Sequence, residues 1–220
     1  IKYIYLILNL FIKECINMVN YLDYISKIND FRYISYSNKS KSIFSNIFYI
    51  NQNKKYEELE TNFFSNSFKK GSTFLDVGAQ TGYYTLLAHS LGAKKVISIE
   101  PDLNSLKILK ANIALNNLNN NTYILSIALY DISTSANIKS KRMKLIPNDD
   151  RFSLKNSDKQ EIESNSTNFV KTQTIRYDDL KDNYLNTKID FIKMDIEGAE
   201  FNALKGMQKI LAKDKPSILL

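Results

Sequence analysis

The chain has 220 residues, 44% hydrophobic and 24% charged, which is long enough for one α/β domain that buries its own core. Its single cysteine, Cys15, and single histidine exclude an internal disulfide and a zinc site of the usual His/Cys kind, and no metal site is predicted. The net charge of +7 is dispersed along the chain and permits an acidic partner, but it makes nucleic acid only an unlikely one. The lone cysteine suits a reducing compartment, so we expect a cytoplasmic protein.

The first 70 residues contain no glycine and are predicted to form a helical or irregular N-terminal extension. Their many Tyr and Phe residues favour a helical core or lid over an aromatic binding platform. The apolar run 1–11 is interrupted by Lys2 and is shorter than the ~20 residues that a membrane span needs. We therefore expect no membrane span and no signal peptide, and a buried or partner-covered helix in that run.

From Gly71 onward, short apolar runs alternate with longer amphipathic stretches. The runs are short and rich in β-branched residues, as is typical of strands buried on both faces. They cover residues 73–77, 96–100, 122–127, 189–194 and 217–220. Strands that alternate with helices predict a Rossmann-like, doubly wound α/β fold: a mostly parallel sheet with helices on both faces, over residues 71–220.

Helices are expected in three of the intervening stretches. Thr81 is a candidate cap for a helix that Gly92 ends, and Asp102 is a candidate cap for the next. A third helix is predicted over 199–213. Residues 132–172 are rich in Ser, Asn and Lys and interrupt the alternation, which indicates a polar insertion: either a substrate-facing loop or a disordered surface loop.

The strongest chemical signal is the turn Asp76-Val77-Gly78-Ala79-Gln80-Thr81-Gly82, between a predicted strand and a predicted helix. Ligands bind at such turns in open α/β sheets, and glycine lets the backbone approach them closely. A dinucleotide fingerprint needs a glycine where this chain has Gln80, and no P-loop motif is present. The pattern therefore favours a ligand with an amino-acid end over one with a pyrophosphate.

Two further acidic motifs end predicted strands and should lie at the same sheet edge. Glu100, followed by Pro101, stands ~20 residues after the turn, where an acid can accept hydrogen bonds from both ribose hydroxyls of a nucleoside. Asp195 begins the motif Asp195-Ile196-Glu197-Gly198-Ala199-Glu200. A carboxylate there can remove the proton of an acceptor hydroxyl, and Asp195 is the preferred candidate. Glu197 and Glu200 could instead stabilise only a helix N-terminus.

The runs 74–85 and 189–200 resemble those of FkbM-family methyltransferases, as do Ser98-Ile99-Glu100-Pro101, Ile127-Ala128-Leu129 and Ile175-Arg176-Tyr177-Asp178-Asp179-Leu180. The resemblance covers about residues 70–220. It implies S-adenosyl-L-methionine (SAM) as cofactor and O-methylation of a small molecule or glycan. The family continues beyond the last run, so the resemblance also implies that the C-terminal strands of the sheet are truncated here.

By position, the resemblance assigns these residues to the SAM site, with the last beside the transferring methyl: Asp76, Gly78, Gln80, Thr81, Gly82, Tyr83, Glu100, Pro101, Ser126, Ala128 and Asp195. Ser126 and Ala128 would lie beside the adenine, and Asp195 and Glu197 are the expected catalytic residues. One alternative is a nucleic-acid methyltransferase, although the usual N/D-P-P-Y/F motif is absent after Met194. The other is a SAM-binding or interaction module without catalysis. The oligomeric state is left open.

Overall fold

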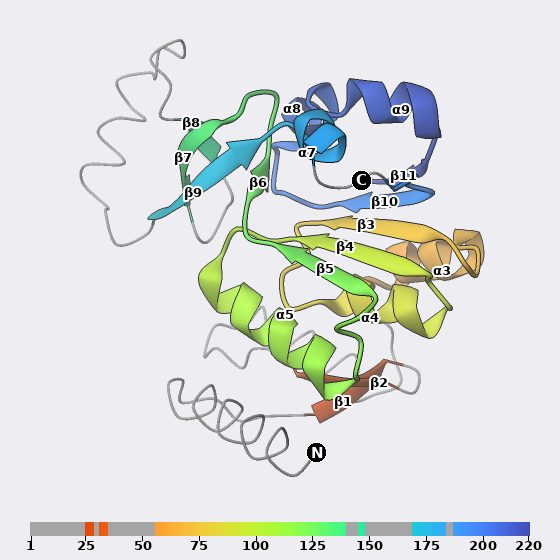
Figure 1. The fold of residues 1–220 in the computed structure, drawn as a ribbon. Coiled ribbons are helices and arrows are strands. Elements are labelled where there is room, and N and C mark those ends of the chain that lie inside the picture. The colour runs from red at the N-terminus through yellow and green to blue at the C-terminus, as the bar shows by residue number, and fades with distance from the viewer. Residues whose placement is uncertain (1–24, 29–30, 35–55, 140–144, 148–168, 184–186) are drawn as a thin grey trace.

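The protein is described by a computed structural model that covers residues 25–28, 31–34, 56–139, 145–147, 169–183 and 187–220. Its centre is a five-stranded sheet in the order β11-β10-β3-β4-β5 (Figure 1). All neighbouring strands in it are parallel. The strands are β3 (Thr73–Val77), β4 (Lys95–Ile99), β5 (Thr122–Leu125), β10 (Phe191–Met194) and β11 (Ser217–Leu219). Because the order runs outward from β3 in both directions, the predicted Rossmann-like sheet is confirmed.

Helices cover both faces of this sheet (Figure 1). One face carries α3 (Glu58–Ser67), α4 (Tyr83–Ser90) and α5 (Leu103–Leu115), and the other carries α7 (Tyr177–Asn183), α8 (Glu200–Lys205) and α9 (Gln208–Asp214). Alternate strand residues point to opposite faces. Phe74 and Phe191 therefore join the core under α3–α5, while Leu75 and Ile192 join the core under α7–α9.

Helix α3 is part of the sheet's packing, although it precedes Gly71, where the methyltransferase domain was predicted to begin. Phe64 on this helix is completely buried. Its ring centroid lies 5.0 Å from those of Phe74 and Phe191 and 5.5 Å from that of Tyr84. Such a set of aromatic contacts fixes the helix on the sheet. The domain boundary at residue 71 stays a prediction.

The N-terminal extension contains a β-hairpin, which the sequence interpretation missed. Strands β1 (Ile25–Ile28) and β2 (Phe31–Ile34) pair antiparallel, and both contact α4. Asn and Asp, residue types that favour tight turns, occupy the two positions between the strands. The expectation of a helical or irregular extension is therefore wrong for residues 25–28 and 31–34. The predicted helix over 1–11 lies outside the described residues.

A second sheet occupies the ends of the predicted polar insertion, so the expectation of an irregular loop is wrong there. It has the order β6-β9-β7-β8, formed by β6 (Ala128–Leu129), β7 (Thr134–Lys139), β8 (Leu145–Pro147) and β9 (Phe169–Ile175). The buried Thr174 hydroxyl lies 3.1 Å from both the amide and the carbonyl oxygen of Thr134. Strand pairing thus satisfies the hydrogen-bonding groups of polar residues. Because these residues form no apolar run, the sequence did not indicate strands here. Residues 148–168 lie outside the described residues.

The predicted helix over 199–213 is two helices, α8 and α9, which meet at Gly206-Met207. A Cβ on Gly206 would lie 2.1 Å from the carbonyl oxygen of Tyr130, so the chain can pass there only as glycine. The Asp178 carboxylate of α7 accepts hydrogen bonds from the amides of Lys209 and Ile210, at 3.1 and 3.2 Å. A side chain remote in sequence therefore starts α9.

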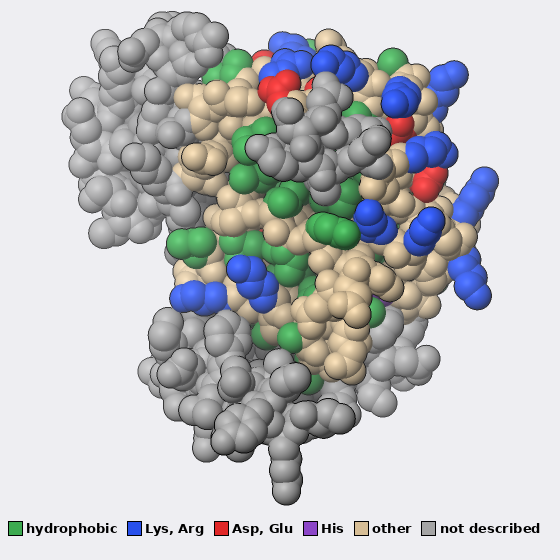
Figure 2. Space-filling view, in the orientation of Figure 1, with side chains coloured by type: hydrophobic (Ala, Val, Ile, Leu, Met, Phe, Trp, Pro, Cys, Tyr) green, Lys and Arg blue, Asp and Glu red, His purple; other side chains and the backbone are tan. Residues whose placement is uncertain are grey.

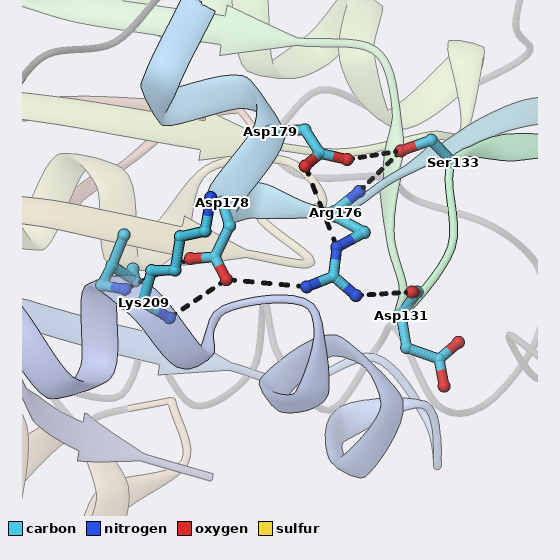
Figure 3. A network of polar contacts seen from close by, with 7 residues as sticks. Asp131, Ser133, Arg176, Asp178, Asp179 and Lys209 are labelled. Atoms are coloured by element: carbon cyan, nitrogen blue, oxygen red, sulfur yellow. Dashed lines mark hydrogen bonds and ion pairs between the residues drawn. The ribbon is translucent and has the colours of Figure 1, made fainter.

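The same carboxylate belongs to a polar network that joins the second sheet to α9 (Figure 3). Arg176 donates to the carbonyl oxygen of Asp131 at 2.9 Å and lies 3.8 Å from the Asp178 carboxylate. Its guanidinium is also 3.9 Å from Asp179, which accepts a hydrogen bond from Ser133. Arg176, Asp178 and Asp179 of the motif 175–180 thus take part in contacts between elements of the fold.

Candidate functional site

The turn after β3 is held between the ends of β4 and β10, the two strands that flank β3. The amides of Gly78 and Ala79 both donate to the carbonyl oxygen of Ile99, at 2.9 and 3.0 Å. Gly78 has φ 80°, and a Cβ there would lie 2.1 Å from the carbonyl oxygen of Asp195. Only glycine fits this conformation and this space. The turn and the end of β10 are therefore in direct backbone contact.

The turn ends at a second glycine, Gly82, which has φ 94° and caps α4 with its backbone alone. A Cβ on Gly82 would meet Leu109 of α5 at 2.6 Å. The prediction that Thr81 caps α4 is wrong, because the Thr81 hydroxyl instead lies 2.5 Å from the hydroxyl of Tyr33. Asp102 does cap α5, accepting a hydrogen bond from the Ser105 amide at 2.8 Å, as predicted.

Glu100 is in register with this turn at the end of β4. Its two carboxylate oxygens accept hydrogen bonds from the amides of Gln80 and Asp102, each at 2.8 Å. The side chain is almost fully buried, and burial raises its pKa to about 7, although the two amide hydrogen bonds favour the charged form. The backbone of Gln80 is left-handed at this point, with φ 47°. Few residues other than glycine and Asn adopt this conformation.

Asp76 is the buried acid at the end of β3, directly before the glycine turn. One of its oxygens accepts a hydrogen bond from Thr85 at 2.6 Å, and Thr85 in turn lies 2.7 Å from the Ser98 hydroxyl. The other oxygen, Oδ1, is buried without a hydrogen-bond partner among the described residues. Burial raises the pKa of Asp76, and the nearby Lys193 ammonium opposes that shift. A buried oxygen with a free acceptor position suits a ligand that brings its own donor.

Asp195 follows β10 and forms an ion pair with Lys193, whose ammonium lies 3.3 Å from its carboxylate. The Lys193 side chain is only 9% exposed, whereas that of Asp195 is 40% exposed. The ammonium also lies 4.7 Å from the ring centroid of Tyr84 and beside Asp76, its partner in the β3–β10 register. Lys193 therefore stands between two acids of the predicted site, and the sequence interpretation did not assign it a role.

The other two acids of this motif differ in their surroundings. Glu200 accepts hydrogen bonds from the amides of Ile196 and Gly198, at 3.0 and 3.1 Å, so it stabilises the turn before α8. This is the helix-terminus role that was the simpler alternative for it. Glu197 is exposed in that turn, at φ 54°. Its predicted catalytic role stays a prediction.

Tyrosines from three separate segments form a wall beside the turn, which we call the tyrosine wall: Tyr33, Tyr56, Tyr83 and Tyr84. The Tyr84 hydroxyl donates to Glu57 at 3.0 Å. Burial raises the pKa of Tyr33 to about 12, so its hydroxyl keeps its proton. Only Tyr83 was predicted to lie here. The aromatic richness of the first 70 residues was the available signal, but it carried no information about which rings meet.

The two residues expected beside the adenine lie near the end of β5. Ser126 directly follows β5 and is exposed, at the sheet edge where Glu100 ends β4. Ala128 is buried in β6, which pairs with β9 in the second sheet. Pro101 is buried after Glu100. Among the described residues, no group of three His, Cys, Asp or Glu side chains could hold a metal ion.

This edge fits SAM in two respects. Each Glu100 oxygen accepts only one backbone amide in the hydrogen bonds described above, which leaves acceptor capacity for ribose hydroxyls. The unpaired Oδ1 of Asp76 can accept from the α-amino group of an amino-acid end. The glycine turn between them lets a ligand approach the backbone.

A sequence model of the FkbM methyltransferase domain matches residues 76–220. The chain therefore belongs to the FkbM methyltransferase family, and SAM is the cofactor of that family. The match contains the glycine turn, Glu100 and Asp195, which confirms the resemblance first noted in those motifs. No curated protein matches the chain.

Several solved structures resemble parts of the chain. TYW2 from P. horikoshii, in complex with MeSAdo, is 22% identical with a TM-score of 0.38, over 48% of this chain and 36% of that one. A ribosomal protein L11 methylase from Lactobacillus delbrueckii subsp. bulgaricus is 27% identical with a TM-score of 0.30, over 32% and 36%. A conserved hypothetical protein from Streptococcus pyogenes is 13% identical with a TM-score of 0.40, over 72% and 69%. The chain spans about a third of the length of TYW2, of the L11 methylase and of three further structures that it matches.

Proposed function

We propose that this protein transfers the methyl group of SAM to a hydroxyl oxygen of a small molecule or glycan, with Asp195 as the base. The observation that carries the proposal is the backbone contact between the carbonyl oxygen of Asp195 and Gly78. It supports the proposal because it brings a partly exposed carboxylate to the glycine turn, which we assign to the cofactor. A hydroxyl must lose its proton on methylation, and a carboxylate within hydrogen-bond distance can accept it.

Each acid of the edge then has a separate task. Glu100 would hold the ribose, and Asp76 would hold the amino end through its free oxygen. The bound cofactor supplies an already activated methyl group, so alignment of the acceptor oxygen provides much of the rate enhancement. Lys193 keeps the Asp195 carboxylate in one orientation through its ion pair. Glu197 is the second candidate for contact with the acceptor, since it is exposed beside Asp195.

Cofactor binding is tested first, by calorimetric titration of the protein with SAM and, separately, with NAD. Binding of SAM but not NAD, lost in Glu100→Ala, is the expected result. A folded protein that binds NAD in preference to SAM would overturn the cofactor assignment.

Catalysis is tested with methyl-labelled SAM and a panel of hydroxyl-bearing sugars and small molecules, with RNA and DNA as comparison acceptors. We expect Asp195→Asn to bind SAM as the unaltered protein does and to lose about a hundredfold or more of its turnover. The parallel variant Glu197→Gln removes the neighbouring charge and tests the second candidate for contact with the acceptor. Full turnover by Asp195→Asn excludes Asp195 as base. Label on nucleic acid alone would favour a nucleic-acid methyltransferase, and SAM binding without labelling of any acceptor would favour a module without catalysis.

A further inference from the structure

Lysines gather at the amino ends of the strands of the central sheet, opposite the cofactor turn. They stand just before, or at the start of, β3, β4, β10 and β11, and at the end of α9: Lys69, Lys70, Lys94, Lys95, Lys188, Lys213 and Lys215. We call this set the lysine rim. Figure 2 shows Lys and Arg side chains along the right-hand edge of the molecule, where the amino ends of these strands lie in Figure 1.

Hydrogen bonds join the segments that carry the rim into one continuous surface. The Lys94 amide donates to the carbonyl oxygen of Ser72 at 2.9 Å, which places the loop before β3 beside the loop before β4. The Lys95 ammonium donates to Thr187 at 3.0 Å, which reaches the segment before β10. The Ser217 amide donates to the carbonyl oxygen of Asp190 at 3.0 Å, which adds the start of β11.

Acidic side chains do little to neutralise this rim. Asp190 forms an ion pair with Lys188 at 2.7 Å. Asp214 is 7% exposed and accepts the Ile189 amide, and its charge also acts on Lys188, so both described acids of this end act on the same lysine. At the other end of the same strands the balance is reversed, because Asp76, Glu100 and Asp195 gather around the single cation Lys193 in the described site. The two ends of the strands therefore carry opposite charge: acids gather at the carboxyl ends and lysines at the amino ends.

We propose that the lysine rim is a docking surface for an anionic lipid membrane. Its lysines are spread over the segments before four strands and the end of α9, which suits an extended charged surface better than a small anion. Clusters of about four to eight lysines are attracted to anionic lipid headgroups in this way. Docking by this edge turns the cofactor turn and Asp195 toward the solution, since they lie at the other ends of the strands.

The composition of the rim favours lipid over nucleic acid. All its cations are lysines, which are point charges and suit a diffuse anionic surface, and none is an arginine, the side chain that most often pairs bidentately with base edges. The exposed aromatic side chain beside it, Tyr123, has the Lys95 ammonium 4.8 Å from its ring centroid. A ring covered in this way offers a poor stacking face to a base, but a tyrosine at a charged edge suits the headgroup region of a bilayer.

The test is co-sedimentation with vesicles of phosphatidylcholine alone and of phosphatidylcholine mixed with phosphatidylserine. We expect binding only to the mixed vesicles, and a steep loss of binding as salt is added. The rim triple variant Lys69→Gln, Lys94→Gln, Lys213→Gln should bind about a hundredfold more weakly, because each lysine near the surface strengthens binding about fivefold.

The matched control is Lys107→Gln, Lys110→Gln, Lys205→Gln, which removes the same charge from exposed lysines outside the rim. It should lose less than about tenfold. Both triples alter exposed side chains, and circular dichroism and SAM binding verify that they remain folded. Equal losses in the two triples, or equal binding to both kinds of vesicle, overturn the proposal. So does a rim-dependent affinity for RNA that exceeds the affinity for mixed vesicles at the same salt concentration.

Discussion

At the scale of single residues, Glu100 combines burial with a position between two backbone donors. Its pKa is raised to about 7 from an ordinary value of 4.5. Between those values the folded protein retains a proton that the unfolded chain has lost, so this group lowers the stability of the fold as pH rises. In its proposed role the same group must be ionised to accept both ribose hydroxyls, so we expect cofactor binding and stability to respond to pH in opposite directions.

We therefore predict that SAM binds more tightly as pH rises through about 7 and that its affinity levels off above. Below that pKa, the dissociation constant should change by up to about tenfold per pH unit. Calorimetric titration on either side of pH 7 measures this directly. Glu100→Gln keeps the shape of the side chain but cannot ionise, and its affinity should be weaker and nearly independent of pH. If the affinity of Glu100→Gln for SAM still changed with pH as that of the unaltered protein does, another group would be responsible for the pH dependence.

Lys193 is the residue on which the charge balance of the site depends. It is buried next to Asp76, which is itself fully buried, and pairs with the more exposed Asp195. Removal of one partner from a buried charge cluster leaves the other uncompensated. The cost falls mainly on Asp76, since water can reach Asp195.

We predict that Lys193→Met lowers the free energy of unfolding by about 3 kcal/mol, measured by urea denaturation at neutral pH. The loss should shrink at acid pH, where Asp76 is protonated, because the ammonium is what opposes the raised pKa of that acid. Lys205→Met, at an exposed position, should change stability by less than about 0.5 kcal/mol. A Lys193→Met protein as stable as the unaltered one would show that Asp76 is already neutral in the fold.

At the scale of elements, the break between α8 and α9 depends on a contact from α7. Asp178 is completely buried at its side chain and accepts the amides of the first turn of α9. A capping carboxylate satisfies donors that the helix itself leaves unpaired. Tertiary contact, and not local sequence, thus decides where this helix starts.

Asp178→Ala should therefore destabilise the protein by about 2 kcal/mol, at the upper end of the range for helix caps because the site is buried. Thermal unfolding followed by circular dichroism provides the measurement. The neighbouring Asp179→Ala removes an equal charge from a side chain that is 49% exposed, and it should cost less than about 1 kcal/mol. Similar losses in the two variants would mean that the Arg176 ion pairs, which both acids share, outweigh the cap.

At the scale of the whole molecule, one parallel sheet separates two hydrophobic cores, and the loops at the two ends of its strands differ in charge. The cores on its two faces follow from the alternation of strand side chains, as Phe74 and Leu75 show. The two ends differ because every strand of the sheet runs in one direction. Loops at the carboxyl ends carry the acids of the cofactor site, and loops at the amino ends carry the lysine rim. Among the described residues, no helix is long and apolar enough to cross a membrane.

The sequence by itself determined the sheet, the family and the acids that gather at the carboxyl ends of the strands. Buried parallel strands appear as short apolar runs, and the glycine turn, Glu100 and Asp195 each follow directly after such a run, so their meeting at one edge follows from strand direction. Asp102 was found as a cap because its hydrogen bond to Ser105 is local.

Only the tertiary structure decided the hairpin, the second sheet, the break before α9 and the surroundings of the site. Tyr33 meets Thr81, Lys193 stands between Asp76 and Asp195, and Asp178 starts α9. These contacts join segments that are far apart along the chain, or depend on which face a strand residue occupies. A single sequence records local periodicity and spacing, but not which distant side chains a common core brings together.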